Sequence, residues 1–286
     1  MNTGTQHSAG RLAAGTTMDR LELRVRDMET MVRYYTEGVG LVPLRTEPGA
    51  AVLGLGGTEV LRLSEAKDLR PGRSGDAGLF HTAVLFDSAA ALARSMESML
   101  TKVPQTYTGA GDHLVSRAFY FTDPEGNGVE LYHDRPRDEW RWDKGQVQMA
   151  TLWLDPVDFV RTNYADGDLS GVLGHVHLQV GDVASARGFY VDTLGFDATA
   201  EFGSSALFVS AGGYHHHMAM NVWNSAGAGP RLNTLGMGVV DIIVPTEDEL
   251  LAARDRLEAR GVDSTLDGGS LTVLDPWRNE LRLRVG

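Results

Sequence analysis

The pattern of hydrophobic and polar positions occurs twice along the chain in the same order. Residues 21–41, LELRVRDMETMVRYYTEGVGL, align without a gap with residues 176–196, VHLQVGDVASARGFYVDTLGF, at a constant offset of 155. Matching residues in register are Leu23 and Leu178, Val25 and Val180, Asp27 and Asp182, Tyr35 and Tyr190, and Gly40 and Gly195. The motif DPEGN at 123–127 is likewise followed by DPWRN at 275–279. Because such matches are hard to obtain by chance, the sequence predicts two homologous halves.

Each half is predicted to contain two small units of the same type. Alternation over 176–180 predicts a strand, Asp182 is a typical helix N-cap, and Gly195 is a typical helix stop. Further strands are predicted at 206–209 and 218–222. The order strand, helix, strands then recurs at 236–243, 247–260, 270–274 and 280–285, and in the first half at 80–86, 89–100, 118–121 and 129–132.

These elements predict an α+β fold of four βαβββ modules, arranged as two tandem domains. The expected domains are residues 17–137 and 171–286. Residues 138–170 contain several tryptophans and are expected to form a packed connector rather than a flexible linker. Residues 1–16 are expected to be a disordered or loosely ordered N-terminus.

Composition narrows the classes of function. The 286 residues are 42% hydrophobic and 22% charged, which is typical of a globular protein with buried cores. The chain has no cysteine, so a metal site would need histidine and carboxylate ligands. A net charge of −12 without a basic stripe argues against nucleic acid as a partner. Neither a signal peptide nor an apolar run long enough for a membrane span is found, so a soluble, cytoplasmic protein is expected.

The repeated motifs resemble those of a known superfamily. A strand, an Asp cap, paired aromatic residues, Leu-Gly-Phe or Val-Gly-Leu, and a closing D-P-x-G-N-x-x-E resemble the vicinal oxygen chelate superfamily of glyoxalases, bleomycin-resistance proteins and extradiol dioxygenases. DHLVS at 112–116 with Tyr120, DPEGNGVEL at 123–131, DRP at 134–136 and GYHHH at 213–217 further resemble bacterial catechol 2,3-dioxygenase-like proteins. The resemblance covers both halves of the chain and implies two tandem vicinal oxygen chelate domains.

The resemblance implies a metal site at the middle of the chain. In this superfamily two neighbouring modules curl around a metal, with one His from the first strand of one module and a His and a Glu from the other. The matching ligands here are His81, Glu130 and His175. The corresponding positions of the other module pair are near Leu235, at Arg282 and at Arg20. One site is therefore expected to be complete, whereas the two arginines would repel a cation from the other.

The donor set itself indicates which metal to expect. Two neutral imidazoles and one carboxylate form a facial triad that leaves positions open for substrate and dioxygen, which suits non-heme Fe(II). Mn, Zn and Ni remain alternatives.

Further histidines and a tyrosine are candidates for catalysis and substrate binding. Alternation along a strand would place His215 and His217 on one face with Asn221, and the family register implies that this face lines the cavity. The resemblance implies that His215 or His217 acts as the acid-base catalyst and that Tyr120 donates a hydrogen bond. Weaker candidates for substrate contacts are His177, Asn221 and His113. An exposed or adventitiously metal-binding histidine cluster is the alternative explanation.

The resemblance therefore implies Fe(II)-dependent extradiol cleavage of a small aromatic diol by dioxygen. A glyoxalase-type isomerase and a metal-dependent thiol transferase use a related metal cradle, so the ligands alone do not exclude them. A metal-free protein that sequesters a small molecule is a further alternative, against which the complete ligand set argues. The sequence neither requires nor excludes a homodimer.

Overall fold

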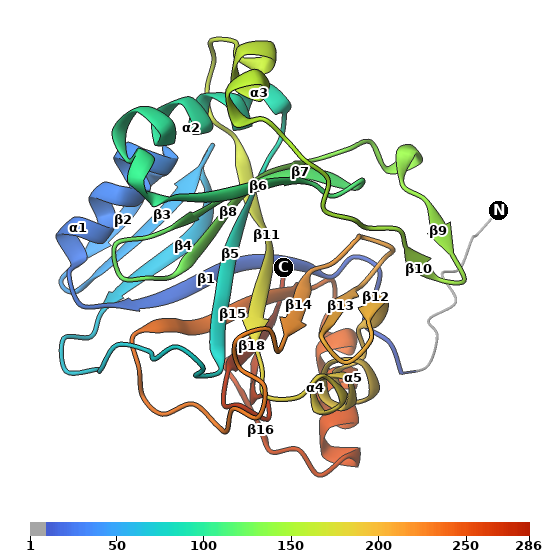
Figure 1. Cartoon of the computed structure of the whole chain (residues 1–286). Helices are drawn as coiled ribbons and strands as arrows, with labels where there is room; N and C mark the ends of the chain where they lie inside the picture. Colours follow the sequence, from blue (N-terminus) through green and yellow to red (C-terminus); the bar gives the residue numbers. More distant parts are fainter. Residues whose placement is uncertain (1–9) are drawn as a thin grey trace.

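Four modules of the same type build the protein, as Figure 1 shows for the computed structural model, which describes residues 10–286. The first comprises β1 (Thr17–Val25), α1 (Met28–Arg33), the π-helical turn η1 (Tyr34–Val39), β2 (Val42–Glu47), β3 (Ala50–Leu55) and β4 (Thr58–Glu65). The second comprises β5 (Gly78–Phe86), α2 (Ala89–Lys102), η2 (Pro104–Thr106), β6 (Tyr107–Asp112), β7 (Ser116–Thr122) and β8 (Gly128–Asp134). The third comprises β11 (Gly171–Gln179), α4 (Val183–Phe189), η4 (Tyr190–Leu194), β12 (Asp197–Phe202), β13 (Ala206–Ser210) and β14 (Met218–Asn221). The fourth comprises β15 (Gly236–Val244), α5 (Glu247–Ala259), β16 (Ser264–Asp267), β17 (Ser270–Leu274) and β18 (Glu280–Val285). The predicted α+β fold of four βαβββ modules is confirmed.

Two eight-stranded sheets combine these modules across the halves of the chain. One sheet has the order β16-β17-β18-β15-β1-β4-β3-β2 and joins the first and fourth modules. The other has the order β12-β13-β14-β11-β5-β8-β7-β6 and joins the second and third modules. At the centre of each sheet the first strands of two modules pair antiparallel, β1 with β15 and β5 with β11. Strands from both halves of the chain therefore lie side by side in each sheet.

The repeated sequence motif stabilises each half in the same way. Asp27 and Asp182 accept hydrogen bonds from backbone amides of the first helical turn, as expected of N-caps. The helices end at Gly40 and Gly195, whose φ angles of 90° and 102° favour glycine. These predicted caps and stops are confirmed.

The matched tyrosines link the two modules of each half. Tyr35 donates from its hydroxyl to Asp123 Oδ2, and Tyr190 donates to Asp275 Oδ2, each over 3.0 Å. Both carboxylates also accept backbone amides of their own D-P turns. The repeated Tyr and Asp therefore serve a structural purpose in both halves.

A continuous hydrophobic core runs through all four modules and includes the fully buried side chains of Leu23, Phe86, Phe196 and Leu283. The segment between the halves contains η3 (Arg137–Glu139), β9 (Trp142–Asp143), β10 (Gln146–Val147) and α3 (Pro156–Asn163). Phe159 of α3 packs against Phe119 with ring centroids 4.9 Å apart, whereas Trp153 is 84% exposed.

The N-terminal segment enters this core within its described part. Residues 1–9 of the expected loose N-terminus lie outside the described residues. Within residues 10–16, Leu12, Ala13 and Thr16 are buried, and the Leu12 amide donates to the Gly195 carbonyl. Among residues 10–286, no helix combines the length and apolar character needed to cross a bilayer.

Candidate metal centre

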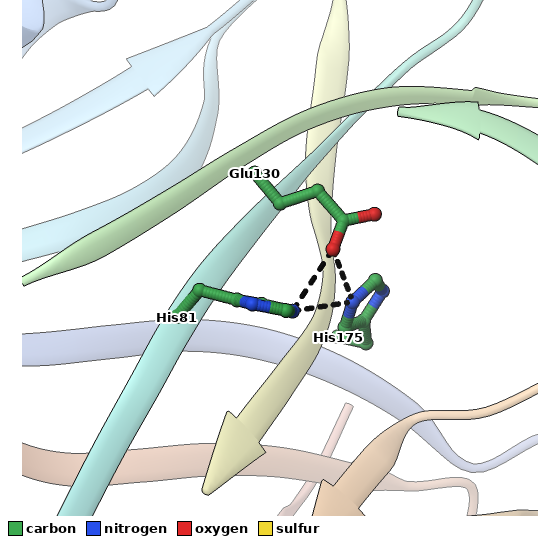
Figure 2. A group of neighbouring side chains, drawn as sticks. All are labelled: His81, Glu130 and His175. Atoms are coloured by element: carbon green, nitrogen blue, oxygen red, sulfur yellow. Dashed lines mark hydrogen bonds and ion pairs between the residues drawn. The ribbon is translucent and has the colours of Figure 1, made fainter. Parts of the chain in front are cut away.

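Three buried side chains converge at the centre of the second sheet. His81 of β5 and His175 of β11 point toward Glu130 of β8, as Figure 2 shows. His81 Nε2 lies 2.9 Å from Glu130 Oε2, His175 Nε2 lies 3.2 Å from the same oxygen, and the two nitrogens are 3.3 Å apart. Within residues 10–286, this is the one group of three or more His, Asp or Glu side chains whose ligand atoms all lie within 4.8 Å.

Strand register brings these residues together from distant parts of the chain. β11 pairs antiparallel with β5 so that His175 lies opposite Ala83, and β5 pairs in parallel with β8 so that Ala83 lies opposite Glu130. An irregularity in the β11 register falls at Gly174. A Cβ atom at this position would overlap the Tyr132 hydroxyl, so glycine permits β11 to approach the tyrosine behind the site.

The protonation states of the cluster favour a cation. Burial alone would raise the pKa of Glu130, but the imidazoles of His175 and His81 outweigh burial and hold that pKa well below its usual range. Burial lowers the pKa of His175 to about 4, although the Glu130 carboxylate opposes the shift. Near neutral pH the site therefore offers a carboxylate and an uncharged His175, which is the form that binds metal.

The distances fit one face of an octahedron. Metal bonds to His nitrogen and carboxylate oxygen are about 2.0–2.2 Å long, so neighbouring ligand atoms of an octahedral site lie roughly 3 Å apart. The three separations of 2.9, 3.2 and 3.3 Å agree with this spacing. Two imidazoles and one carboxylate on one face leave the opposite face free for other ligands.

A cavity of about 1080 Å³ opens beside the three ligands, and all three contribute to its wall. Aromatic rings form much of the adjoining wall. Phe80 lies edge-on to Trp223 at 5.4 Å and to His177 at 5.0 Å between ring centroids. The space is large enough for a substrate of drug size, and the aromatic wall suits a flat ring.

Tyr120 and His113 lie together on the cavity wall, as expected of candidate site residues. His113 Nδ1 lies 2.9 Å from the Ala150 carbonyl, and its Nε2 lies 2.7 Å from the Tyr120 hydroxyl. A carbonyl only accepts, so Nδ1 carries the proton of the neutral ring and the Tyr120 hydroxyl donates to Nε2. Burial, followed by the nearby Glu130, raises the pKa of Tyr120 well above its usual range, so the phenol stays protonated.

His177 and Asn221 differ in their relation to the cavity. His177 lines it beside the ligands, whereas Asn221 is fully buried and is absent from the wall. The Asn221 side-chain amide lies 2.9 Å from His177 Nε2, to which it donates. Asn221 therefore orients His177, and its expected direct contact with substrate finds no support in this arrangement.

The expected orientation of the histidine run is wrong. His216 lines the cavity, and neither His215 nor His217 belongs to its wall. β14 begins only at Met218, so the three histidines lie in an irregular segment to which strand alternation does not apply. The His216 ring centroid is 4.1 Å from that of His175. Sequence reasoning missed His216 because it extended strand alternation through the run, which set His215 and His217 on the cavity face.

His215 and His217 lie away from the cavity and form hydrogen bonds that fix the segment in place. His215 Nε2 lies 2.9 Å from Asp134 Oδ1, and its Nδ1 lies 2.7 Å from His216 Nδ1. His217 Nδ1 lies 3.0 Å from the Ser210 hydroxyl and accepts from the Ala211 amide. Burial lowers the pKa of His217 to about 3.

The equivalent position in the other sheet holds an ion-pair network. Arg20 and Arg282 both pair with the buried Asp241, at 2.9 and 2.6 Å, and Arg20 also pairs with Glu59. Asp241 lies opposite Arg20 on one side and Arg282 on the other, as Ala83 lies between His175 and Glu130. The same register places Val239, rather than a residue near Leu235, at the position of His81. Two cations and no imidazole stand where the second site would have its ligands.

The chain is similar to known proteins both in sequence and in fold. The sequence model of the Glyoxalase/Bleomycin resistance protein/Dioxygenase superfamily matches residues 17–131 and 172–282. A catechol-2,3-dioxygenase of Bacillus subtilis (strain 168) is 35% identical over 269 residues, covering 89% of this chain and 92% of the relative. Among solved structures, a protein of Bacillus subtilis subsp. subtilis str. 168 matches with a TM-score of 0.66 at 13% identity over 97% of this chain and 86% of its own. Glyoxalase I from Zea mays matches with a TM-score of 0.57 at 17% identity over 95% and 92%. The two structural matches show a shared fold.

Proposed function

Because the chain belongs to the glyoxalase/bleomycin resistance protein/dioxygenase superfamily, we propose that it is an extradiol dioxygenase that opens the ring of a catechol with dioxygen. The 35% identity to a catechol-2,3-dioxygenase over most of both chains supports this activity. The observation that carries the proposal is the facial arrangement of His81, Glu130 and His175 beside a large cavity.

The three ligands would hold a divalent metal, for which we propose Fe(II). Bound there, the ion would supply adjacent coordination positions for the two oxygens of a catechol and for dioxygen. The protein contributes a buried carboxylate that offsets the charge of the ion and an aromatic wall that accepts the ring. Phe80, His177 and Trp223 supply that wall next to the ligands.

His216 is the residue that we assign as the proton acceptor. Asp134 only accepts hydrogen bonds, so His215 in its neutral form donates from Nε2 and accepts at Nδ1. His216 then donates from Nδ1 to His215, which leaves its Nε2 with a free lone pair. Burial, together with the neighbouring His175 and His215, holds the pKa of His216 well below its usual range. The low pKa keeps His216 neutral, with a lone pair on the cavity wall. As a weak base it would take the proton of a phenol that a bound metal makes more acidic, and return that proton later in the reaction.

Tyr120 and His113 would act on the substrate from another part of the wall. The Tyr120 hydroxyl hydrogen can rotate from His113 toward the cavity and donate to a substrate oxygen. His113, whose Nδ1 is held by the Ala150 carbonyl, accepts from the phenol at Nε2 and so positions the hydroxyl before its hydrogen turns to the substrate.

The proposal is tested by loading metal-free protein anaerobically with Fe(II), Mn(II), Zn(II) or Ni(II) and adding catechol and air. We expect oxygen uptake and a yellow ring-opened semialdehyde with Fe(II). A parallel assay offers the hemithioacetal of methylglyoxal and glutathione to the same samples. Isomerisation of the hemithioacetal, with catechol untouched by every metal form, would reject the dioxygenase in favour of a glyoxalase-type isomerase.

A further inference from the structure

Two arginine side chains, Arg73 and Arg231, lie on the wall of the cavity that contains the three candidate metal ligands. Arg73 is exposed, whereas Arg231, in the segment between β14 and β15, is partly buried. Arg231 Nη1 donates to Asn279 Oδ1 over 3.2 Å, and its Nη2 donates to the Met237 carbonyl over 3.0 Å and to the Thr234 hydroxyl over 3.3 Å. All three acceptors are neutral. A guanidinium has five N–H donors, so two, including that of Nε, have no acceptor among the described residues.

No carboxylate among residues 10–286 forms an ion pair with Arg231, although two acidic residues lie in its surroundings. Asp76 is held by Arg70 at 3.2 Å and by the Arg73 amide. Asp275 accepts from the Trp277 amide and the Tyr190 hydroxyl. Burial, together with the nearby Arg24, lowers the pKa of Arg231, which is the direction expected for a cation without a close counterion. A partly buried guanidinium of this kind gains stability from an anion in the cavity.

The backbone makes room for this side chain at Gly78. A Cβ atom there would lie only 3.0 Å from Arg231 Nε, and the φ of +143° also disfavours any other residue. Gly78 begins β5, three residues before the ligand His81. At about 3.3 Å per residue, the guanidinium lies roughly 10 Å along the strand from the ligand.

We propose that Arg231 is a specificity-determining residue that binds a carboxylate on the substrate. This inference rests on the proposed function and names the substrate class: a catechol that carries a carboxylate at the end of a short side chain. The diol would lie at the metal ligands, the ring against the aromatic wall, and the carboxylate at Arg231. The charged guanidinium, with two N–H groups that have no acceptor, suits a carboxylate, and the anionic group at one end fixes which way the ring enters.

The first test compares two substrates in the unmodified holoenzyme. We expect kcat/KM for 3-(3,4-dihydroxyphenyl)propionate to exceed that for its primary amide by at least about tenfold, since only the acid carries the charge that the guanidinium can pair with. Both compounds have the same shape, so the comparison isolates the charge without any change to the protein. Equal values for the acid and the amide would overturn the carboxylate site.

Variants identify the arginine responsible. R231M should bring the ratio of kcat/KM for the acid to that for the amide close to one. R231K should retain part of the ratio, because lysine keeps the charge but not the geometry of the guanidinium. R73M is the matched control, since Arg73 lines the same cavity but is exposed. Loss of the ratio in R73M with its retention in R231M would overturn the assignment to Arg231.

A binding measurement separates this inference from the proposed function. Metal-free protein is titrated calorimetrically with 3-phenylpropionate, which has no diol, and with 3-phenylpropionamide. We expect the acid to bind at least about tenfold more tightly than the amide, and R231K to lose part of that difference. Arg231-dependent binding of the acid without any catechol turnover would support the anion site and reject the dioxygenase. Turnover of acid and amide at equal rates would support the dioxygenase and reject the anion site.

Discussion

Arg20 occupies in one sheet the position that His175 occupies in the other. Each lies on the first strand of its module, opposite a residue of the antiparallel partner strand, Asp241 or Ala83. In one sheet the strand register assembles two imidazoles and a carboxylate, and in the other it assembles an ion-pair network. The duplicated architecture thus carries a candidate metal site in one sheet and structural charge pairing in the other.

Removing the central carboxylate of that network should destabilise the protein. In Asp241→Ala, Arg20 and Arg282 lose their shared partner inside the sheet, so the free energy of unfolding should fall by about 3 kcal/mol. Urea denaturation measures the change. Asp158→Ala is the control, because its pair with Arg161 is exposed and should contribute less than about 0.5 kcal/mol. Equal effects of the two substitutions would show that the network adds no stability.

Removing one ligand should abolish metal uptake. His175→Ala leaves one imidazole and one carboxylate. Loss of a residue that only supports a ligand typically lowers metal affinity by roughly 10–100-fold, and loss of a ligand itself should lower it further. Equilibrium dialysis with elemental analysis measures the loss. His133→Ala is the matched control, because His133 hydrogen bonds the Phe86 carbonyl and lies outside the ligand group. Full metal uptake by the His175 variant would contradict the assigned site.

His216 and His217 should respond differently to the same substitution. Asparagine can keep the hydrogen bond that each histidine makes through Nδ1, but it lacks Nε2. His216→Asn should therefore lower kcat by roughly 10²–10⁴-fold, while metal content is retained. His217→Asn should leave kcat within a small factor of the unmodified enzyme. The reverse order in steady-state assays of the two metal-loaded variants would restore His217 as the acid-base residue.

The buried His217 should make stability depend on pH. Its pKa of about 3 in the folded protein lies below the value near 6.5 expected when it is unfolded, so only the unfolded state gains a proton between these values. The contribution of His217 to the free energy of unfolding is complete above about pH 6.5 and is lost progressively toward pH 3. Between pH 7.5 and 5 the loss amounts to about 2 kcal/mol.

Denaturation of metal-free protein at the two pH values checks this dependence. Comparison with His217→Asn removes the effects of other titrating groups, and the variant should lose about 2 kcal/mol less on acidification. Parallel losses in both proteins would show that His217 does not titrate on unfolding.

The three residues of the candidate metal site could be named from sequence because the motifs around them resemble those of the superfamily. His81 and Glu130 lie in the second module and His175 in the third, and the pairing of β5 with β8 and with β11 brings them together. The histidine run could not be assigned in this way, since Gly212 and Gly213 adopt φ angles of 64° and 69° just before it and interrupt the alternation. Local chain geometry, rather than residue type, decides which of the three histidines reaches the cavity.

Two other features required the three-dimensional structure. The ion pairs of Asp241 could not be predicted from sequence. Its partners Arg20 and Arg282 are distant along the chain and come close to it only through strand pairing. Arg231 lies in a segment without periodicity, so its place on the cavity wall follows from tertiary packing alone.

The central claim, that a single centre built from His81, Glu130 and His175 supports ring cleavage, is tested most directly by titrating metal-free protein with Fe(II) under anaerobic conditions. At each point the initial rate of ring-opened product is measured after adding 3-(3,4-dihydroxyphenyl)propionate and air. We expect the rate to rise linearly and to reach a plateau at one equivalent of iron per chain, with Glu130→Gln inactive throughout. A rate that is independent of added iron, or a Glu130→Gln variant that titrates like the unmodified protein, would contradict the account.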